Sequence, residues 1–362
     1  MSPDVIVIGA GIVGAACAAS LVREKLNVVV LDDRPPGSGA TAAGMGHITV
    51  MDDSPAQFEL TRFSVKRWLE LAPQLPREAE FERRGTIWVA AGEDEMAAVR
   101  GKLDFYQQQG VRAEVMDERV LAEAEPRLRP GLSGGLLVPD DSVVYAPVIA
   151  RWLLRGAELR VGRATDVKAN SVKLAGGEAL SAQSIVIAAG TWSAELAGPL
   201  PIRPRKGHLA ITDRYPGFVR HQLLELGYLK SAHGQDNESV AFNVQPRATG
   251  QVLIGSSRQF DMADSLVEPR FLARMLARAV DFMPALRDLN VIRTWTGFRA
   301  ATPDSLPLIG PCPGRPGVWL ATGHEGLGIT TSLATAELIA AGILGRTPPI
   351  PAQPYLPERY AA

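Results

Sequence analysis

The sequence predicts an α/β fold in which a dinucleotide-binding domain, built from separated segments, carries an inserted β-rich α+β domain. Three observations support this. Residues 5–23 read as a buried strand, a glycine turn and a helix, and residues 317–344 repeat that pattern near the other end of the chain. Residues 202–260 between them are rich in β-forming residues. The two glycine turns therefore belong to one domain, and the β-rich stretch is inserted into it.

The first glycine turn has the spacing of a Rossmann-like dinucleotide site. The apolar run at 5–8 leads into Gly9, Gly11 and Gly14, and a helix follows directly. In this pattern the first glycine permits the tight turn, the second lets the backbone approach a pyrophosphate, and the third lets the helix lie close to the strand. A second strand ends at Asp32, an acid that could accept hydrogen bonds from ribose hydroxyls.

The remaining elements are assigned from hydrophobic periodicity. Helices are expected at 55–75, 93–110, 145–156 and 268–286. Strands are expected at 83–91, as short pieces within 158–190, and through 202–260. The dinucleotide-binding domain is predicted to comprise 1–82, 140–201 and 293–347, the inserted domain 83–139 and 202–292, and a proline-rich tail 348–362.

Composition limits the classes of function. The chain has 362 residues and a formal net charge of −1, which does not favour binding to nucleic acid or to an anionic membrane surface. It has two cysteines, too few to hold a zinc or iron–sulfur centre alone, so no metal site is expected. We find no signal peptide before the first strand and no apolar run long enough to span a bilayer, and we expect a cytoplasmic protein.

Three further stretches carry chemical information. The strand in "SIVIAAGTWSAEL" (184–196) ends in small residues that could approach a planar cofactor, although an ordinary core strand would look the same. In "GFRAATPDSLPLIGP" (297–311), Arg299 needs an anion, either a ligand carboxylate held by two parallel hydrogen bonds or a structural partner such as Asp304. In "LATGHEGLGITTSLATAEL" (320–338), a glycine turn opens into a helix whose N-terminus would stabilise negative charge.

Together these motifs resemble the D-amino-acid oxidase (DAO) superfamily of FAD-dependent amine oxidoreductases, which includes glycine oxidase, sarcosine oxidase β subunit and D-arginine dehydrogenase. The resemblance covers nearly the whole chain. It is strongest toward the β subunits of D-hydroxyproline dehydrogenase and opine oxidase. The family's order is followed by "VIVIGAGIVGAACA", "VVLD", "TAAGMG", "VIAAGTWS", "RPRKGH", "GQVLIGSS", "GFRAATPDSLPLIGP" and "ATGHEGLGITTS".

The resemblance implies a bound FAD and a β-sheet substrate domain. Asp32 takes the place of the family's usual glutamate on the adenosine ribose, and a helix N-terminus after the second glycine turn would face the charge that develops at N1 and the C2 carbonyl of a reduced flavin. The cofactor-binding set implied in this way comprises Gly9, Gly11, Ile12, Val13, Gly14, Asp32, Asp33, Thr41, Ala42, Ala43, Gly44, Met45, Ala189, Gly190, Trp192, Arg299, Gly323, Glu325, Gly326, Leu327, Gly328, Ile329 and Thr330.

Three residues are expected to act on the substrate. Arg299 matches the arginine that holds the substrate carboxylate, and Tyr228 in "LGYLKS" matches a tyrosine that contacts the same group; a packed sheet tyrosine is the alternative. His47 follows the "AAGMG" loop, where it could orient the substrate or take a proton from its ammonium, unless it is structural.

Two departures from the family pattern bear on function. Gly297 stands where sarcosine-oxidase-type members carry the cysteine that attaches the flavin, so non-covalent FAD is expected. Leu253 stands where those oxidases carry a lysine that promotes reaction with oxygen, which favours a dehydrogenase.

The predicted function is oxidation of a small amino or imino acid, D-hydroxyproline-like or another D-amino acid, to the imine by hydride transfer from Cα to flavin N5. Electrons would pass to an acceptor other than oxygen. The alternatives are a glycine- or sarcosine-type oxidase producing hydrogen peroxide, and a flavoprotein subunit of a multi-subunit opine or hydroxyproline dehydrogenase. Two more distant alternatives are an NAD-dependent Rossmann dehydrogenase, which would not need the second glycine turn, and a non-catalytic flavoprotein.

Overall fold

The chain passes back and forth between two units in the computed structural model, which describes residues 2–227, 238–260, 262 and 264–360. Unit 1 comprises Met1–Ala79, Val144–Arg205 and Phe298–Ala362. Unit 2 comprises Glu80–Val143 and Lys206–Gly297. The long strands β13 (Arg203–Arg214) and β17 (Val291–Ala301) each contain a point where the chain passes from one unit to the other.

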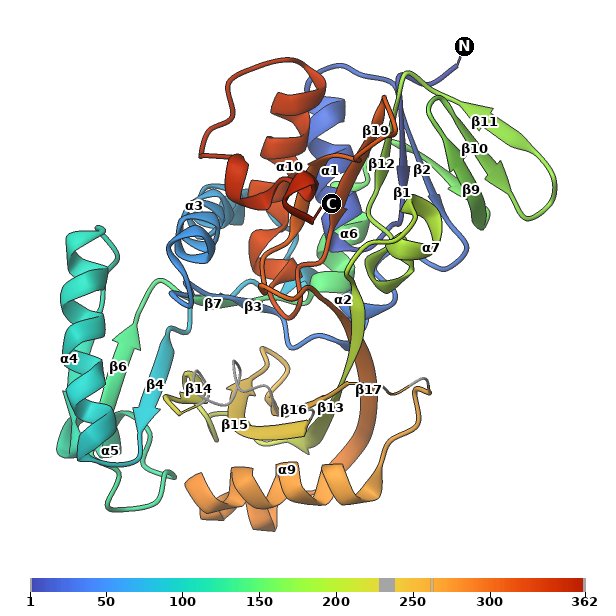
Figure 1. Cartoon of the computed structure of the whole chain (residues 1–362). Coiled ribbons are helices and arrows are strands. Elements are labelled where there is room, and N and C mark those ends of the chain that lie inside the picture. Colours follow the sequence, from blue (N-terminus) through green and yellow to red (C-terminus); the bar gives the residue numbers. More distant parts are fainter. Residues whose placement is uncertain (1, 228–237, 261, 263, 361–362) are drawn as a thin grey trace. The chain divides into compact units, whose positions relative to one another are not determined.

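Unit 1 is built on a six-stranded sheet in the order β18-β19-β12-β1-β2-β8 (Figure 1). Neighbouring strands are parallel except β18, which pairs antiparallel with β19. The strands are β1 (Val5–Ile8), β2 (Val28–Asp32), β8 (Glu158–Val161), β12 (Ser184–Ile187), β18 (Leu308–Pro311) and β19 (Val318–Thr322). Strands from three distant parts of the sequence therefore end at one edge, where α/β sheets bind ligands.

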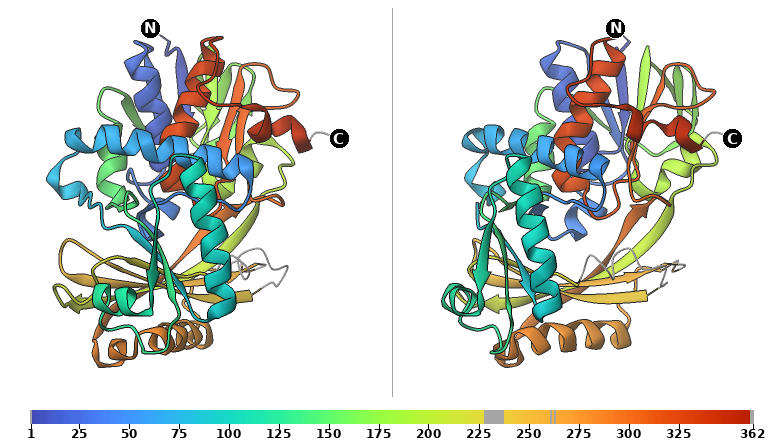
Figure 2. Two further views of the ribbon diagram at one scale, coloured as in Figure 1. Left: turned by 90° about the vertical axis from the view of Figure 1, so that its left-hand side faces the viewer. Right: turned by 60° about the vertical axis from the view of Figure 1, so that its left-hand side comes forward.

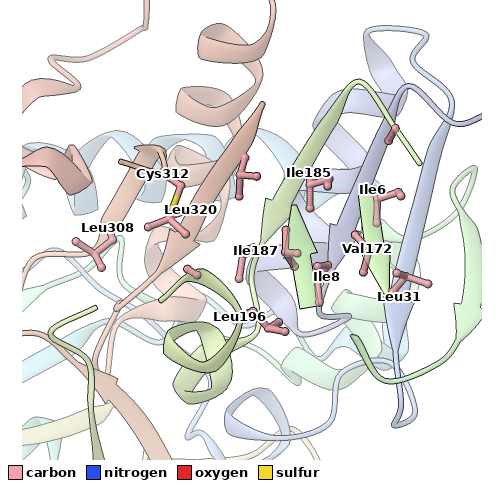
Figure 3. Close-up of a cluster of buried hydrophobic side chains, with 14 of the residues drawn as sticks. Ile6, Ile8, Leu31, Val172, Ile185, Ile187, Leu196, Leu308, Cys312 and Leu320 are labelled. Atoms are coloured by element: carbon pink, nitrogen blue, oxygen red, sulfur yellow. The ribbon is translucent and has the colours of Figure 1, made fainter. Parts of the chain in front are cut away.

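Both faces of this sheet are covered, which explains its continuous apolar strands. On one face, alternate residues such as Ile6, Ile8 and Ile187 pack with Val172 and Leu196, which come from a small antiparallel sheet and a short helix (Figure 3). On the other face, helices α1 (Ile12–Arg23) and α10 (Gly328–Ile343) lie side by side (Figures 1 and 2).

The rest of unit 1 frames this core. Its small antiparallel sheet consists of β9 (Ala164–Lys168), β10 (Ser171–Leu174) and β11 (Ala179–Ser181). Its other elements are α2 (Ala40–Ala43), β3 (His47–Ile48), α3 (Pro55–Leu71), α6 (Ala146–Leu153), α7 (Ser193–Ala197) and short 3₁₀ turns at Ala72–Gln74, Arg77–Ala79, Gly190–Trp192, Gln353–Tyr355 and Pro357–Tyr360. The tail is anchored to this unit, because the Tyr355 hydroxyl donates to the Ala56 carbonyl at 2.6 Å and Arg359 pairs with Asp304 at 2.7 Å.

Unit 2 contains an eight-stranded sheet in the order β17-β13-β16-β15-β14-β4-β6-β5. Helix α9 lies along one face of it (Figure 2), where Met275, Ala279 and Phe282 join a core with Phe242 and Val244. Its other elements are β4 (Thr86–Ala90), α4 (Glu93–Gln108), β5 (Glu114–Asp117), α5 (Glu118–Ala124), β6 (Gly134–Val138), β7 (Ser142–Val143), β14 (Gln222–Glu225), β15 (Glu238–Pro246), β16 (Gln251–Gln259), α9 (Pro269–Phe282) and a 3₁₀ turn at Pro284–Asp288.

The predicted fold class is confirmed: a mixed α/β chain with a parallel, segmented sheet in one unit and a large mixed sheet in the other. Cys17 lies on the buried side of α1, and burial raises the pKa of its thiol to about 12, as suits a small core residue. In the part of the chain that the structure describes, no helix is long and apolar enough to cross a membrane.

Candidate functional site

The first glycine turn brings three backbone segments into contact. Gly9 has a φ of +111°, and a Cβ there would lie 2.4 Å from the Ala188 carbonyl oxygen at the end of β12. A Cβ at Gly14 would lie 1.9 Å from the carbonyl oxygen of Gly9. Both contacts are with backbone, which cannot swing aside. Glycine is therefore required at both positions for α1 to begin directly above the end of β1.

Asp32, at the end of β2, is fixed by the backbone around it. One carboxylate oxygen accepts from the Ala10 N–H at 2.7 Å, and the other accepts from the Arg34 N–H at 2.9 Å. These bonds hold the carboxylate against the glycine turn. The expectation that Asp32 also contacts a ribose is consistent with this placement and stays a prediction.

The loop containing α2 and β3 is tied to the starts of both long helices. The Thr41 hydroxyl accepts from the Ile12 N–H in the first turn of α1 at 2.9 Å. The Thr330 hydroxyl, in the first turn of α10, donates to the His47 carbonyl at 3.0 Å and accepts from the Thr49 N–H at 3.2 Å. Helix N-termini favour anions, so this loop runs beside two positions suited to phosphate or a developing negative charge.

The end of β12 is joined to the end of β19. The Thr322 hydroxyl donates to the Gly190 carbonyl at 3.0 Å and pairs with the Ser193 hydroxyl at 2.9 Å. Beyond this joint, Trp192 is 43% exposed, and the Arg34 guanidinium lies 4.5 Å from the centre of its ring. The predicted cofactor-facing strand end thus lies beside Asp32 and the first glycine turn.

The second glycine turn combines positive φ values with a backbone bridge. Gly323 has φ +76°, and Glu325, which is not a glycine, has φ +50°. The Glu325 N–H donates to the Ala300 carbonyl at 2.9 Å, which fixes the turn to β17 next to Arg299. A Cβ at Gly326 would lie 3.6 Å from Arg299 Nε. The Arg299 side chain therefore runs along this turn, just before α10 begins.

One ion pair holds the turn to the middle segment of unit 1. Arg205 Nη1 lies 3.1 Å from Glu325 Oε1, and these side chains are only 7% and 14% exposed. Asp304, the structural partner considered for Arg299, is paired with Arg359 instead. Asp304 is near Arg299 in the sequence, but the fold brings it to Arg359, which is 55 residues further along the chain.

His324 is buried within the same turn. Its Nε2 lies 2.9 Å from the Thr335 hydroxyl, one of the α10 side chains, and burial lowers the pKa of the imidazole to about 3. The ring is therefore neutral at physiological pH and serves to pack the turn onto α10.

The structure gathers most of the predicted site residues at one edge of unit 1, at the ends of β1, β2, β12 and β19 and the starts of α1 and α10. The predicted residues placed there are Gly9, Gly11, Ile12, Val13, Gly14, Asp32, Asp33, Thr41, Ala42, Ala43, Gly44, Met45, His47, Ala189, Gly190, Trp192, Arg299, Gly323, Glu325, Gly326, Leu327, Gly328, Ile329 and Thr330. Tyr228 lies outside the described residues. Among the described residues, no group of three or more His, Cys, Asp or Glu side chains could hold a metal ion.

This edge fits a dinucleotide. In the first glycine turn a side chain at Gly9 or Gly14 would collide with backbone, and in the second Gly323 has a φ that favours glycine. Two helices begin at this edge, and an acid ends the second strand. The fold and the site together define a dinucleotide-binding protein of the doubly covered α/β class.

Comparison with known proteins names the family. The model of the DAO family, described as FAD dependent oxidoreductase, matches residues 4–341, and the chain belongs to that family. It is 28% identical to glycine oxidase of Pseudomonas aeruginosa over 99% of both chains, and 26% identical to the B subunit of opine oxidase of Rhizobium meliloti over 94% of both. The crystal structure of glycine oxidase from Geobacillus kaustophilus superposes with a TM-score of 0.89 at 25% identity, covering 99% of both chains.

These findings confirm that the protein is an FAD-dependent amine oxidoreductase. The sequence reasoning missed Arg205, which the structure pairs with a residue of the second glycine turn. The signal present in the sequence was an arginine in "RPRKGH" ahead of an apolar strand, where a buried charge requires a partner. Which of the chain's acids provides that partner could not be predicted from the sequence.

Proposed function

We propose that this protein oxidises the Cα–N bond of a small amino or imino acid, D-hydroxyproline or a similar D-amino acid, and passes the electrons to an acceptor other than oxygen. The observation that carries the proposal is the position of Arg299 along the second glycine turn, next to the start of α10. A guanidinium at the cofactor-binding edge suits a carboxylate, because its planar fork makes two parallel hydrogen bonds.

The chain's own residues would position the substrate. Arg299 would hold the carboxylate and so fix the direction of the Cα–H bond. Tyr228 is proposed to contact the same carboxylate, and His47 to orient the amine or accept a proton from the ammonium. FAD, when bound, supplies the hydride acceptor at N5. The resulting imine would be hydrolysed by water once it leaves the site.

The acceptor is inferred from Leu253. It is buried within strand β16 at the place where sarcosine-type oxidases carry an oxygen-activating lysine. An aliphatic side chain there offers no positive charge to stabilise superoxide, which favours a dehydrogenase. A glycine-type oxidase remains the second candidate, supported by the likeness to glycine oxidase along the whole chain.

A multi-subunit assembly is the third candidate. It rests on the likeness to a protein named as the B subunit of an opine oxidase, and that name implies at least one other subunit. Expression of this chain alone, followed by measurement of its mass in solution and of its reduction by amino acids, would test whether it acts without a partner.

Substitution of Arg299 tests the proposed site. Each charge-assisted hydrogen bond contributes about 1.5–3 kcal/mol, so Arg299→Ala should lower kcat/KM by roughly two to four powers of ten. Arg299→Lys should restore only part of this, because lysine lacks the fork. Arg67→Ala, which removes a guanidinium that pairs with Glu337 on α10, is the control and should leave kcat/KM unchanged within about twofold.

The measurements are anaerobic bleaching of the flavin and steady-state turnover with an artificial dye. The substrate panel contains D-, L- and N-methyl amino acids and free and 4-hydroxylated prolines. Normal flavin reduction and unchanged substrate affinity in Arg299→Ala would show that the carboxylate binds elsewhere. Loss of FAD or of folding would show that Arg299 is structural.

A further inference from the structure

The parallel sheet of unit 1 has two edge strands, and only one of them is covered. At one edge, β18 ends in Pro311 and is packed against the tail, so that a Cβ at Gly310 would lie 2.7 Å from Leu356 Cδ2. At the other edge, β8 pairs with β2 and with no other strand among the described residues. Leu159 and Val161 of β8 are 50% and 88% exposed. Soluble proteins usually cover or charge such an edge, because it can pair with a further strand.

The backbone groups on the open side of β8 belong to Leu159 and Val161. The Gly162 N–H donates to the Asp32 carbonyl at 3.0 Å, toward β2. Backbone groups of successive residues in a strand point to opposite sides, so those of Arg160 face β2 and those of Leu159 and Val161 face away. In the part of the chain that the structure describes, no hydrogen bond reaches them from that side. Their N–H and C=O groups are therefore open to another strand.

The side chains of β8 alternate between apolar and charged. Leu159 and Val161 share one face of the sheet, and Glu158 and Arg160 share the other. Arg160 forms an ion pair with Glu178, in the turn between β10 and β11. The Glu158 side chain has no hydrogen bond or ion pair within the described ranges. Because a guanidinium has five N–H donors, Arg160 can hold a second carboxylate besides that of Glu178.

This charge pattern is complementary to an antiparallel copy of itself. With a two-fold axis at Leu159, Glu158 of each copy lies opposite Arg160 of the other, which gives two cross-strand pairs of opposite charge. The two Leu159 residues then face each other as a hydrogen-bonded pair. With the axis at Arg160, two guanidinium groups lie opposite each other, which is unfavourable. Charge complementarity therefore favours the axis at Leu159.

A bound nucleotide is the other candidate for covering part of this strand. Val161 lies opposite Asp32, at the edge of the sheet that fits a dinucleotide. Leu159 lies opposite Val30, two residues further from that edge, and Glu158 lies further still. A nucleotide at the edge would cover Val161 first, and it explains neither the open backbone groups of Leu159 nor the unpaired charge of Glu158.

We propose that β8 pairs antiparallel with β8 of a second copy of this chain, about a two-fold axis at Leu159, and joins two six-stranded sheets edge to edge. A strand of four residues buries less surface than the roughly 1,200 Å² of a standard interface, so the dimer should be reversible, with a Kd on the order of micromolar. The proposal concerns assembly and does not depend on which substrate is oxidised.

The test is sedimentation velocity of the purified holoenzyme at concentrations from below to well above the expected Kd. The wild type should change from the mass of one chain to that of two. Glu158→Arg and Arg160→Glu each convert both cross-strand pairs into like-charge pairs, and each should raise the Kd at least ~10-fold. The double variant exchanges the two charges, restores both opposite-charge pairs and should return the Kd to within about threefold of the wild type.

Three further variants serve as controls and as a second probe. Glu178→Gln breaks only the ion pair of Arg160 within the chain and should leave the Kd within about threefold. Glu123→Arg makes the same change of charge on α5, where the glutamate pairs with Arg119 at the surface, and should also leave the Kd unchanged. Leu159→Lys places two like charges at the axis and should abolish the dimer while the protein keeps its FAD.

The proposal is overturned if the wild type has the mass of one chain at every concentration, if the single charge variants leave the Kd unchanged, or if the double variant does not recover the dimer. It is also overturned if Leu159→Lys releases FAD without changing the mass, because the nucleotide would then be what covers this strand. If Arg160→Glu does not fold, Glu158→Arg and Leu159→Lys, both at exposed positions, decide the question.

Discussion

His324 makes the stability of the second glycine turn depend on pH. The imidazole is buried against α10 and hydrogen-bonded to the Thr335 hydroxyl, and burial lowers its pKa to about 3. In the unfolded chain the pKa returns to its ordinary value of about 6.5. Below that pH the unfolded state binds a proton that the folded state excludes. The free energy of unfolding therefore falls as the pH decreases from about 6.5 toward about 3.

The size of this effect follows from the two pKa values. Between pH 7.5 and pH 5.0 the unfolded state gains about 2 kcal/mol from protonating one imidazole of pKa about 6.5, while the folded state gains almost nothing. For a chain of 362 residues, an unfolding entropy of about 2.1 cal/mol/K per residue converts this into a shift of Tm of about 2–3 °C.

The assay is the change in Tm between these two pH values for the wild type, His324→Gln and Thr335→Val. His324→Gln removes the titrating group and should lose about 2–3 °C less than the wild type on acidification. Thr335→Val removes the hydrogen bond but leaves the imidazole buried, so its Tm should be lower at both pH values with the wild-type pH dependence. An identical pH dependence in His324→Gln and the wild type would refute the reasoning.

Three further predictions concern the cofactor and the electron acceptor. Gly14→Ala places a Cβ 1.9 Å from the Gly9 carbonyl oxygen, so α1 must move away from β1 and the purified protein should bind FAD at least about tenfold more weakly; Gly101→Ala, where a Cβ meets nothing within 4 Å, should bind FAD normally. Acid precipitation should release the yellow chromophore into the supernatant, because Gly297 offers no thiol for attachment; colour kept in the washed pellet would contradict this. Turnover with an artificial dye should exceed turnover with oxygen, because Leu253 supplies no cation, and equal rates would count against a dehydrogenase.

The backbone geometry of the edge that fits a dinucleotide was largely predictable because its signals are local. Gly9 and Gly14 stand five residues apart, and their spacing alone implies the close approach of helix and strand that the structure shows. The second glycine turn and the helix from Gly328 were predictable for the same reason. The small residues at the end of β12 were ambiguous in the sequence, and only the fold places the Ala188 carbonyl oxygen against Gly9.

The sequence did not predict which residues pair between distant segments. Asp304 pairs with Arg359, and Arg205 pairs with Glu325, each across a separation of more than fifty residues. A charged residue in an apolar stretch of sequence needs a partner in the fold, but its charge does not identify which residue that partner is. Such pairings depend on strand order, which no local pattern determines.

The difference between local signals and long-range pairings explains why the class of cofactor is easier to infer from the sequence than the substrate. The dinucleotide site depends on backbone geometry, since Gly9, Gly14 and Gly323 occupy positions that a side chain cannot fill or a φ that favours glycine. Substrate preference depends instead on which side chains the fold brings together, as it brings Arg205 to Glu325 from positions 120 residues apart. Relatives with the same fold can therefore differ in substrate, and identities near 26–28% establish the chemistry of the family more firmly than the substrate of this member.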